Sequence, residues 1–405
     1  MRKGARFKHS FSTAAVAALL VAGSAAAGQN AIKIGVMIDG SGFAQDIGGA
    51  GAVTAAEMAA ADYGGKAMGK PIQIISADMQ NKPDVASSIA RQWFDQDQVD
   101  TITDLPVSSV GLAVQQSGKE KHKVLLISAA ATAELTGAQC SPYSIQWADD
   151  TAALANGTAR AVVANGGKKW FFITADFAFG QAMEAAATSV IKASGGEVLG
   201  DVKHPLGTND FSSYLLKAQA SGANIIGLAN VGLDSIATIR QAGEFGLTQG
   251  GQQLAGFIVF ISDIHSLGLK TAQGTYVTTG FYWDDSDGTR AFAKRFYEKR
   301  QRMPTKEQAN TYAAVLHYLK AIDAAHSDDA DKVMAQMKAM PTDYFGRQGS
   351  IREDGRVLYD LALYQVKKPE ESKYPWDYYK KIRDIRADEA FRPLADGGCP
   401  FVKKN

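Results

Sequence analysis

"IKIGVMIDGSGFAQDIGGAGAVTAAEMAAADYGG", residues 32–65, contains one complete strand, loop and helix pattern. Residues 32–38 are a short apolar run, which predicts a β-strand. The next ten residues are rich in glycine and small polar residues, as is typical of a loop. Residues 48–65 are rich in alanine and end at two glycines, which predicts a helix.

The same order of elements repeats along the chain. Strand-like runs at residues 71–78, 99–105 and 123–130 alternate with helical stretches, and the pattern restarts after residue 149 with runs at 169–176, 223–230 and 254–260. Such alternation predicts parallel sheets covered by helices on both faces. The restart predicts two similar α/β lobes.

The first 27 residues are predicted to be a secretory signal peptide. "MRKGARFKHS" carries four basic residues and no acid, a short apolar run follows, and Ala25 and Ala27 form a cleavage pair. Removing this segment changes the formal net charge from +1 to −3. The mature chain has no basic stripe for nucleic acid and no later segment apolar enough to span a membrane.

The chain has only two cysteines, Cys140 and Cys399. Two isolated cysteines cannot form a four-ligand zinc site alone, and in an oxidising compartment a pair predicts one disulfide. Two unrelated buried thiols are the alternative.

Candidate binding residues follow the predicted strands. In an open parallel sheet, ligands bind beyond the carboxyl ends of the strands and at helix N-termini. The candidates there are hydroxyl, aromatic, small, amide and acidic residues: Phe43, Ser108, Ser109, Ala130, Thr132, Phe179, Asn230 and Asp263. Hydroxyls and free N–H groups at a helix start can hold a carboxylate, and aromatic rings can cover an apolar ligand. For Ser108 and Ser109, simple helix capping is the alternative.

The sequence offers little for catalysis. It lacks G-x-S-x-G and H-E-x-x-H motifs, and its six histidines show no spacing typical of metal ligands. "GGAGAV", residues 48–53, is only a weak match to a dinucleotide-binding loop because its third glycine is missing. We therefore expect no enzyme, no metal and no cofactor.

Several motifs together resemble one family. "IKIGVMIDGSGFAQDIGGAGAVTAAEMA", "DLPVSS", "VLLISAAATAELTG", "DFAFGQAM" and "IRQAGEFGL" are similar in order and spacing to type I periplasmic solute-binding proteins of ABC importers. The branch they resemble is that of the leucine-isoleucine-valine-binding proteins. The resemblance implies two Rossmann-like lobes joined by three hinge crossings, near residues 144–150, 277–283 and 349–354.

The resemblance also implies ligand contacts. Ser108 or Ser109, with Ala130 and Thr132, would hold the ligand carboxylate, and Phe179 would cover the ligand. One departure concerns the ammonium group of an amino-acid ligand: "FIVFISDIHS" has no glutamate where the amino-acid binders have one, and Asp263 is only roughly placed. The tyrosine that the family has after "GLAN" is replaced by Val231.

An unpaired buried ammonium is costly, so this departure disfavours an α-amino ligand. The aromatic residues Phe43, Phe179, Tyr282 and Trp283 suit an aromatic or other apolar carboxylate. Packing within the hinge is the alternative role of Trp283 and Trp147.

The resemblance therefore predicts the following organisation. Residues 28–146 and 278–349 form the first lobe, residues 147–277 and 350–375 form the second, and residues 376–405 form a tail that returns to the first lobe. We expect a monomeric periplasmic protein that captures an apolar or aromatic carboxylate, or a branched-chain or aromatic amino acid, and delivers it to an ABC permease in the inner membrane. A sensor that docks to a membrane receptor and a hydrolase on the same scaffold are the alternatives.

Overall fold

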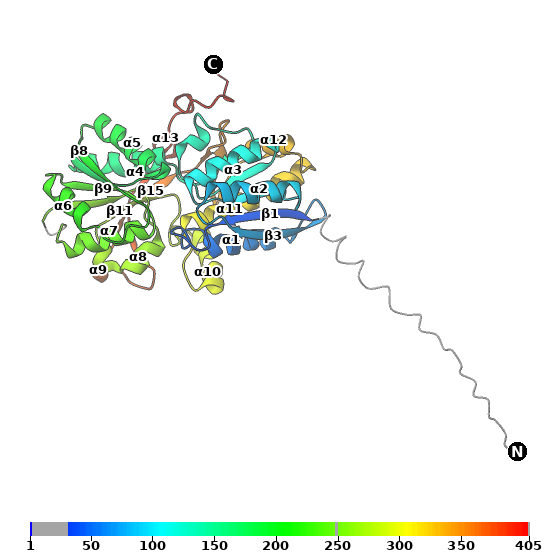
Figure 1. The fold of residues 1–405 in the computed structure, drawn as a ribbon, viewed down its shortest axis with the longest axis horizontal. Helices are drawn as coiled ribbons and strands as arrows, with labels where there is room; N and C mark the ends of the chain where they lie inside the picture. Colours follow the sequence, from blue (N-terminus) through cyan, green and yellow to red (C-terminus); the bar gives the residue numbers. More distant parts are fainter. Residues whose placement is uncertain (2–30, 248–249, 404–405) are drawn as a thin grey trace.

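The structure is a computed structural model that describes residue 1, residues 31–247 and residues 250–403. Apart from Met1, the predicted signal peptide lies outside the described residues. Figure 1 shows two α/β lobes side by side, each with a central sheet and helices around it. The two sheets of mostly parallel strands confirm the predicted α/β fold class.

The first sheet has six strands in the order β2-β3-β1-β4-β5-β6. Its strands are β1 (Ile32–Ile38), β2 (Lys66–Ala67), β3 (Lys70–Asp78), β4 (Thr101–Asp104), β5 (Val124–Ile127) and β6 (Ser144–Gln146). All neighbours are parallel except β2 and β3. Its helices are α1 (Gly49–Asp62), α2 (Pro83–Asp95), α3 (Ser108–Glu120), α10 (Asp287–Arg300), α11 (Lys306–Ala325) and α12 (Ala330–Ala339).

Helices cover both faces of this sheet. Ile32, Ile34 and Val36 of β1 pack with α1 and α11, whereas Met37 packs with α2 and α3 on the other face. Alternate residues of a strand point to opposite faces, so a strand buried on both faces is apolar along most of its length. This explains why β1 was evident in the sequence.

The second sheet has seven strands in the order β16-β15-β11-β10-β9-β7-β8. They are β7 (Lys169–Ala175), β8 (Glu197–His204), β9 (Ile225–Ala229), β10 (Gln253–Gly256), β11 (Tyr276–Thr279), β15 (Leu361–Val366) and β16 (Tyr379–Ile385). β15 is antiparallel to both of its neighbours, β11 and β16, and all other neighbours are parallel. The helices here are α4 (Thr151–Ala164), α5 (Ala178–Ala193), α6 (Ser212–Ala220), α7 (Leu233–Glu244), α8 (Ile261–Leu267), α9 (Leu269–Ala272) and α13 (Ala387–Ala390).

The chain passes between the two lobes at residues 147–150, 280–286 and 359–360, which we call the three crossings. A small sheet of β12 (Thr342–Tyr344), β13 (Arg347–Ile351) and β14 (Val357–Leu358) precedes the third crossing. Part of the predicted C-terminal tail is a strand, because β16 pairs with β15 at the edge of the second sheet. The lobe boundaries themselves stay a prediction.

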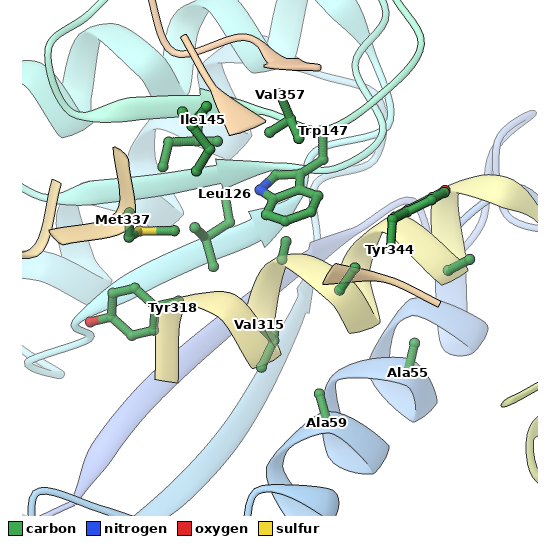
Figure 2. Close-up of a cluster of buried hydrophobic side chains, with 14 of the residues drawn as sticks. Ala55, Ala59, Leu126, Ile145, Trp147, Val315, Tyr318, Met337, Tyr344 and Val357 are labelled. Carbon is green, nitrogen blue, oxygen red and sulfur yellow. The ribbon is translucent and has the colours of Figure 1, made fainter. Parts of the chain in front are cut away.

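The core of the first lobe extends to the first crossing. Figure 2 shows Trp147 packed beside Ile145 and Val357, with Val315 of α11 and Ala55 of α1 in the same cluster. Trp147 is fully buried. Since a large ring in a close-packed core cannot move freely, the first crossing leaves the lobe from a fixed point.

The predicted disulfide between Cys140 and Cys399 is confirmed, with 5.5 Å between the two Cα atoms. It attaches the last described residues to the loop after 3₁₀ helix η2 (Ala133–Thr136) of the first lobe. Within the described ranges, no helix combines the length and the apolar character that crossing a bilayer needs.

Candidate functional site

A pocket lies where the carboxyl ends of the two sheets face each other. We call it the cleft pocket, and its lining comes from both lobes: Phe43, Ile47, Pro106, Ser108, Ala129 and Ala131 of the first, and Phe177, Phe179, Val231, Ile258 and Phe260 of the second. Loops at the carboxyl ends of parallel strands are where α/β folds bind ligands.

Phe43 is held in place by the carboxylate of Asp39, which directly follows β1. Asp39 accepts hydrogen bonds from the backbone N–H groups of Gly42 at 2.7 Å and Ala44 at 2.8 Å. It also accepts one from the Asn81 side chain at 2.8 Å. The loop therefore closes around a single buried acid and presents the ring of Phe43 to the opposite lobe.

Ser108 is the first residue of α3 and lines the cleft pocket with 2% of its surface exposed. The N-cap residue is Val107, which supplies no side-chain cap to the helix. The first N–H groups of a helix lack partners within the helix and carry partial positive charge. Ser108 and this uncapped helix start therefore supply hydrogen-bond donors at one end of the pocket, of the kind that can hold an anion, whereas Ser109 is half-buried and outside the lining.

The turn before α3 is unusual. Asp104 and Leu105 have φ values of 75° and 60°, in the left-handed region that residues with side chains rarely adopt. Such conformations cost about 1–3 kcal/mol each and concentrate at functional sites. The turn places Pro106 and Ser108 at the pocket.

The loop after β5 contributes small residues. Ala129 and Ala131 line the cleft pocket, whereas Ala130 points into the core of the first lobe. Thr132 accepts a hydrogen bond from Glu134 N at 3.4 Å and caps η2, outside the lining. From behind, the Gln146 side chain donates to the carbonyl oxygens of Ala130 and Thr132 at 2.8 and 2.9 Å, so the loop is held in one conformation.

Phenylalanine rings from both lobes form the apolar wall of the cleft pocket. The ring centroids of Phe43 and Phe177 lie 6.0 Å apart in an edge-on arrangement across the two lobes, and those of Phe177 and Phe179 lie 5.9 Å apart. Edge-on contacts at this distance are favourable. With Phe260, they make the pocket a mainly apolar enclosure.

The structure brings together Phe43, Ser108 and Phe179 of the predicted site residues, and places Asn230 outside the lining. Asn230 is buried in a network of its own: its side chain donates to Thr238 Oγ1 at 3.0 Å and accepts from Ser235 Oγ at 2.8 Å. A buried amide needs hydrogen-bond partners, and Thr238 and Ser235 satisfy the side chain of Asn230.

Asp263 also lies outside the lining. Its carboxylate accepts from Phe260 N at 2.9 Å and caps the start of α8. Burial raises the pKa of Asp263 to about 7, against the lowering effect of that hydrogen bond. Asp263 therefore supports Phe260, which lines the pocket, from behind.

Trp283 lines a second cavity at the hinge, which we call the hinge chamber. Its lining is Val259, Phe260, Ile261, Thr279, Phe281, Tyr282, Trp283, Pro304, Lys306 and Tyr379. The Trp283 indole N–H donates to the carbonyl of Trp376 at 2.9 Å, so one edge of the ring is bound to the second lobe.

One carboxylate binds all three crossings together. Asp149, on the first crossing, accepts from Gly280 N of the second at 3.1 Å and from the Tyr359 hydroxyl of the third at 2.8 Å. It also pairs with Lys306 Nζ at 2.9 Å, and both side chains of this ion pair are at most 5% exposed. Asp149 therefore fixes the arrangement of the crossings.

Two further acids are buried beside this ion pair. Burial raises the pKa of Glu307 to about 8, with Lys306 opposing and the charges of Asp149 and Asp104 adding to the effect. Burial also raises the pKa of Asp104 well above its usual value, and its carboxylate oxygens have no hydrogen-bond partner among the described residues. Both groups therefore favour the neutral form near the site.

The two lobes touch directly at Gly232, the N-cap of α7. It has φ +61°, and a Cβ atom added there would lie 2.6 Å from the backbone oxygen of Phe43 in the other lobe. A contact this short is not possible without moving the lobes apart, so the observed approach needs a glycine at this position.

Sequence reasoning did not select several lining residues: Ile47, Pro106, Ala129, Ala131, Phe177, Val231, Ile258 and Phe260. Phe177 could have been found, because it lies two residues after the end of β7 and two residues before Phe179. Ile258 and Phe260 could not, because their apolar run 254–260 predicts a longer strand, whereas β10 ends at Gly256. The described part of the chain contains no group of three His, Cys, Asp or Glu residues that could hold a metal ion.

Comparison with known proteins identifies relatives over most of the chain. The family model described as periplasmic binding protein matches residues 31–373. The chain is 24% identical over 336 residues to the Leu/Ile/Val-binding protein homolog 6 of Brucella melitensis, a match that covers 80% of this chain and 84% of the relative.

Solved structures give the same result. A periplasmic binding protein from Burkholderia mallei is 47% identical, with a TM-score of 0.90, over 93% of this chain and 100% of that one. A branched chain amino acid ABC transporter periplasmic ligand-binding protein from Burkholderia xenovorans LB400 is 42% identical, with a TM-score of 0.84, over 91% of this chain and 99% of that one. A solute binding protein from R. palustris in complex with benzoate has the same fold at 19% identity, with a TM-score of 0.80, over 91% of this chain and 99% of that one.

The matched family model spans both lobes and the residues that line the cleft pocket. The chain therefore belongs to the periplasmic binding protein family, as its sequence predicted, and is a solute-binding protein rather than an enzyme.

Proposed function

We propose that the protein is the periplasmic substrate-binding component of an ABC importer and that it captures a small apolar or aromatic carboxylate. In this proposal the ligand lies in the cleft pocket, with its carboxylate at Ser108 and the start of α3 and its apolar body between the phenylalanines. The lobes close around it by a hinge motion, and the closed form delivers it to a permease in the inner membrane.

The observation that carries the proposal is the uneven polarity of the cleft pocket. Four phenylalanine rings from both lobes enclose it, and the uncapped start of α3 with Ser108 lies at one end. An apolar body needs such an enclosure, and a carboxylate needs such donors.

The residues that line the cleft pocket favour one class of ligand. Among the described residues that line the cleft pocket, none is aspartate or glutamate. A buried ammonium without an acid would be costly, which favours a carboxylate without an α-amino group over leucine or phenylalanine. The benzoate complex of the R. palustris protein indicates that the fold can hold such an acid.

Export, the permease and a monomeric state belong to the same proposal. The predicted signal peptide supports export, and the Burkholderia xenovorans relative is named as a periplasmic protein of an ABC transporter. The two lobes present their surfaces together only when closed, which supports recognition of the closed form by the permease.

The first test is thermal unfolding of the ligand-stripped mature protein with branched-chain amino acids, aromatic amino acids and aromatic or aliphatic carboxylates. A ligand at about a hundred times its dissociation constant stabilises a protein by roughly 2.7 kcal/mol. We expect carboxylates without an amino group to raise the melting temperature most. Equal stabilisation by leucine or phenylalanine would contradict the proposed ligand class.

Replacement of Ser108 by alanine should weaken binding of the best acid by roughly 10- to 100-fold, because a hydrogen bond to a charged group contributes about 1.5–3 kcal/mol. Isothermal titration calorimetry measures this change. Ser109→Ala is the matched control, since Ser109 lies outside the lining, and it should change affinity less than two-fold or so. A larger loss of affinity in Ser109→Ala than in Ser108→Ala would show that Ser109, and not Ser108, binds the carboxylate.

Replacement of Gly232 by alanine should weaken the same binding by roughly ten-fold, because the new methyl group meets Phe43 O across the cleft and overpacking costs about 1–3 kcal/mol. Gly222→Ala is the matched control: φ is +73° there, but no atom lies within 4 Å of the added methyl group. If both variants lose affinity equally, the lobes do not depend on the Gly232 contact for closure.

A further inference from the structure

The C-terminal tail begins as part of the second lobe. β16 pairs with β15 at the edge of the second sheet, and α13 packs against α4 of the same lobe (Figure 1). The side-chain amide of Asn156 on α4 donates to the carbonyl oxygen of Ala390, the last residue of α13, at 2.8 Å. The tail is therefore attached to the second lobe up to Ala390.

Two residues later the tail is attached to the first lobe. The Arg392 side chain donates to the carbonyl oxygen of Ala133 in η2 at 2.6 Å. The Arg392 carbonyl oxygen accepts at 2.7 Å from Arg352 Nη1, on the turn between β13 and β14. The chain therefore passes between the lobes a further time between Ala390 and Arg392, and we call this segment the fourth crossing.

The tail continues along the first lobe beyond the fourth crossing. Cys399 is bonded to Cys140 in the loop after η2, and Lys119 Nζ lies 5.0 Å from the centroid of the Phe401 ring. Lys119 is in the last turn of α3, about 16 Å along the helix axis from Ser108 at the cleft. The tail is therefore held to the first lobe well beyond the point at which it arrives there.

The anchors of the fourth crossing leave little slack. Two residues of fully extended chain span at most about 7 Å, so an opening that separates Ala390 from Arg392 by more than this must break the bonds of one of them. The chain from Ala390 to Cys399 would still reach about 30 Å when extended. The disulfide therefore keeps a released segment beside its docking site, where the contacts of Arg392 re-form at high effective concentration.

Arg392 docks on the loop that contributes to the cleft pocket. Ala133 stands two residues after Ala131, which lines the pocket. On its other side the same loop is bonded to Thr151 at the start of α4, whose N–H donates to Ala131 O at 2.8 Å and whose hydroxyl accepts from Ala133 N at 3.3 Å. The loop is therefore held by α4 and by the tail together.

We propose that the C-terminal tail is a fourth connection between the lobes, that it restricts their opening and positions the loop after β5 at the cleft pocket, and that the Cys140–Cys399 disulfide keeps it docked. Arg392 is a positioning residue in this arrangement, since it touches the loop and lies outside the lining of the pocket. A pocket that is held in place loses less conformational freedom when a ligand binds. The inference concerns the motion of the lobes and does not depend on which ligand the cleft takes.

Pulsed electron paramagnetic resonance on the ligand-free mature protein tests the restriction of opening. Nitroxide labels on Glu57→Cys in α1 and Lys217→Cys in α6, both exposed, report the distance between the lobes, and the bonded native cysteines take up no label. We expect a narrow distance distribution with the disulfide intact. Adding Cys140→Ser and Cys399→Ser should broaden the distribution and shift it to longer distances. An identical distribution in the serine variant would overturn the proposal, because the other three crossings alone would then set the range of opening.

Hydrogen exchange tests the positioning of the loop in variants that keep the disulfide. Arg392→Ala removes the side-chain bond to the loop and should speed exchange of the Gly137 N–H, which donates to Glu134 O, by about ten-fold or more, the effect of losing one hydrogen bond from a charged group. Arg386→Ala is the matched control: Arg386 is an exposed arginine of the same tail that pairs with Asp388, and its loss should leave the exchange unchanged.

The same nitroxide labels on Arg392→Ala should also give a broader distance distribution than on Arg386→Ala, so the restriction stays testable if the serine variant does not fold. Equal exchange, or equal distance distributions, in the two arginine variants would overturn the positioning role of Arg392. Neither experiment uses a ligand. A failure here therefore leaves the proposed function standing, and the thermal unfolding panel tests that function separately.

Discussion

Replacement of Asp149 by alanine should lower the free energy of unfolding by about 3–5 kcal/mol, the cost of leaving a buried charge without its partner. The variant leaves the ammonium of Lys306 uncompensated, and it removes the acceptor of Gly280 N and of the Tyr359 hydroxyl. Because these groups come from different crossings, we also expect the relative position of the lobes to be less well defined. Urea unfolding measures the first effect and small-angle X-ray scattering the second.

A double-mutant cycle separates the ion pair from the other contacts. Lys306→Met with Asp149→Ala removes both charges, so the double variant should be more stable than the sum of the single effects predicts. Asp95→Ala is the control, because its ion pair with Lys121 at 2.6 Å is largely exposed, and surface pairs contribute only about 0–1 kcal/mol. If Asp149→Ala and Asp95→Ala cost the same, Asp149 does not hold the hinge.

Replacement of Glu307 by glutamine should make the protein less sensitive to alkaline pH. The folded-state pKa of Glu307 is about 8, against a usual value of 4.5. The folded protein therefore keeps a proton that the unfolded chain loses. The contribution of this proton to the free energy of unfolding is fully present below about pH 4.5, and it is lost as the pH rises from there through about 8.

The expected size of this loss is about 3–5 kcal/mol, since one pKa unit corresponds to about 1.4 kcal/mol. The groups that face Glu307 are Lys306, Asp149, Asp104 and the side-chain amide of Asn310, which donates to it at 3.0 Å. They remain in the variant, so the difference between the two proteins isolates Glu307. Urea unfolding at pH 5, 7 and 9 measures it.

The two stability curves should lie close together near pH 5, separate steadily between pH 5 and about pH 8 and run parallel above it, with Glu307→Gln the more stable protein at high pH. Glu353→Gln is the control, because Glu353 is exposed and its stability curve should follow that of the unmodified protein. Parallel curves for Glu307→Gln and the unmodified protein would show that Glu307 is ionised in the fold at neutral pH.

The elements that the sequence predicted well are those buried on both faces or regular over many residues. The predicted strand at residues 32–38 agrees with β1, and the run at 169–176 agrees closely with β7. β16 was missed because only Tyr379 and Ile385 of its seven residues are buried. An edge strand with exposed charged residues lacks the apolar pattern by which strands are recognised.

The candidate site was partly predictable for a similar reason. Ser108, Phe43 and Phe179 lie in the loops or helix starts that come after β4, β1 and β7, so their place at the carboxyl edge follows from the order of elements. Asn230 follows β9 in the same way, yet its side chain is bonded within the second lobe. The position of a residue along the chain determines the edge at which it lies, but not the direction of its side chain.

The sequence by itself determined the α/β class, the pairing of the two cysteines and the family, because periodicity, composition and motif order are local properties of the chain. Only the tertiary structure decided that Asp149 joins three crossings and that Phe260 separates two cavities. Asp149 and Lys306 are separated by 157 residues. Contacts between such distant residues depend on how the lobes pack, and no local pattern records them.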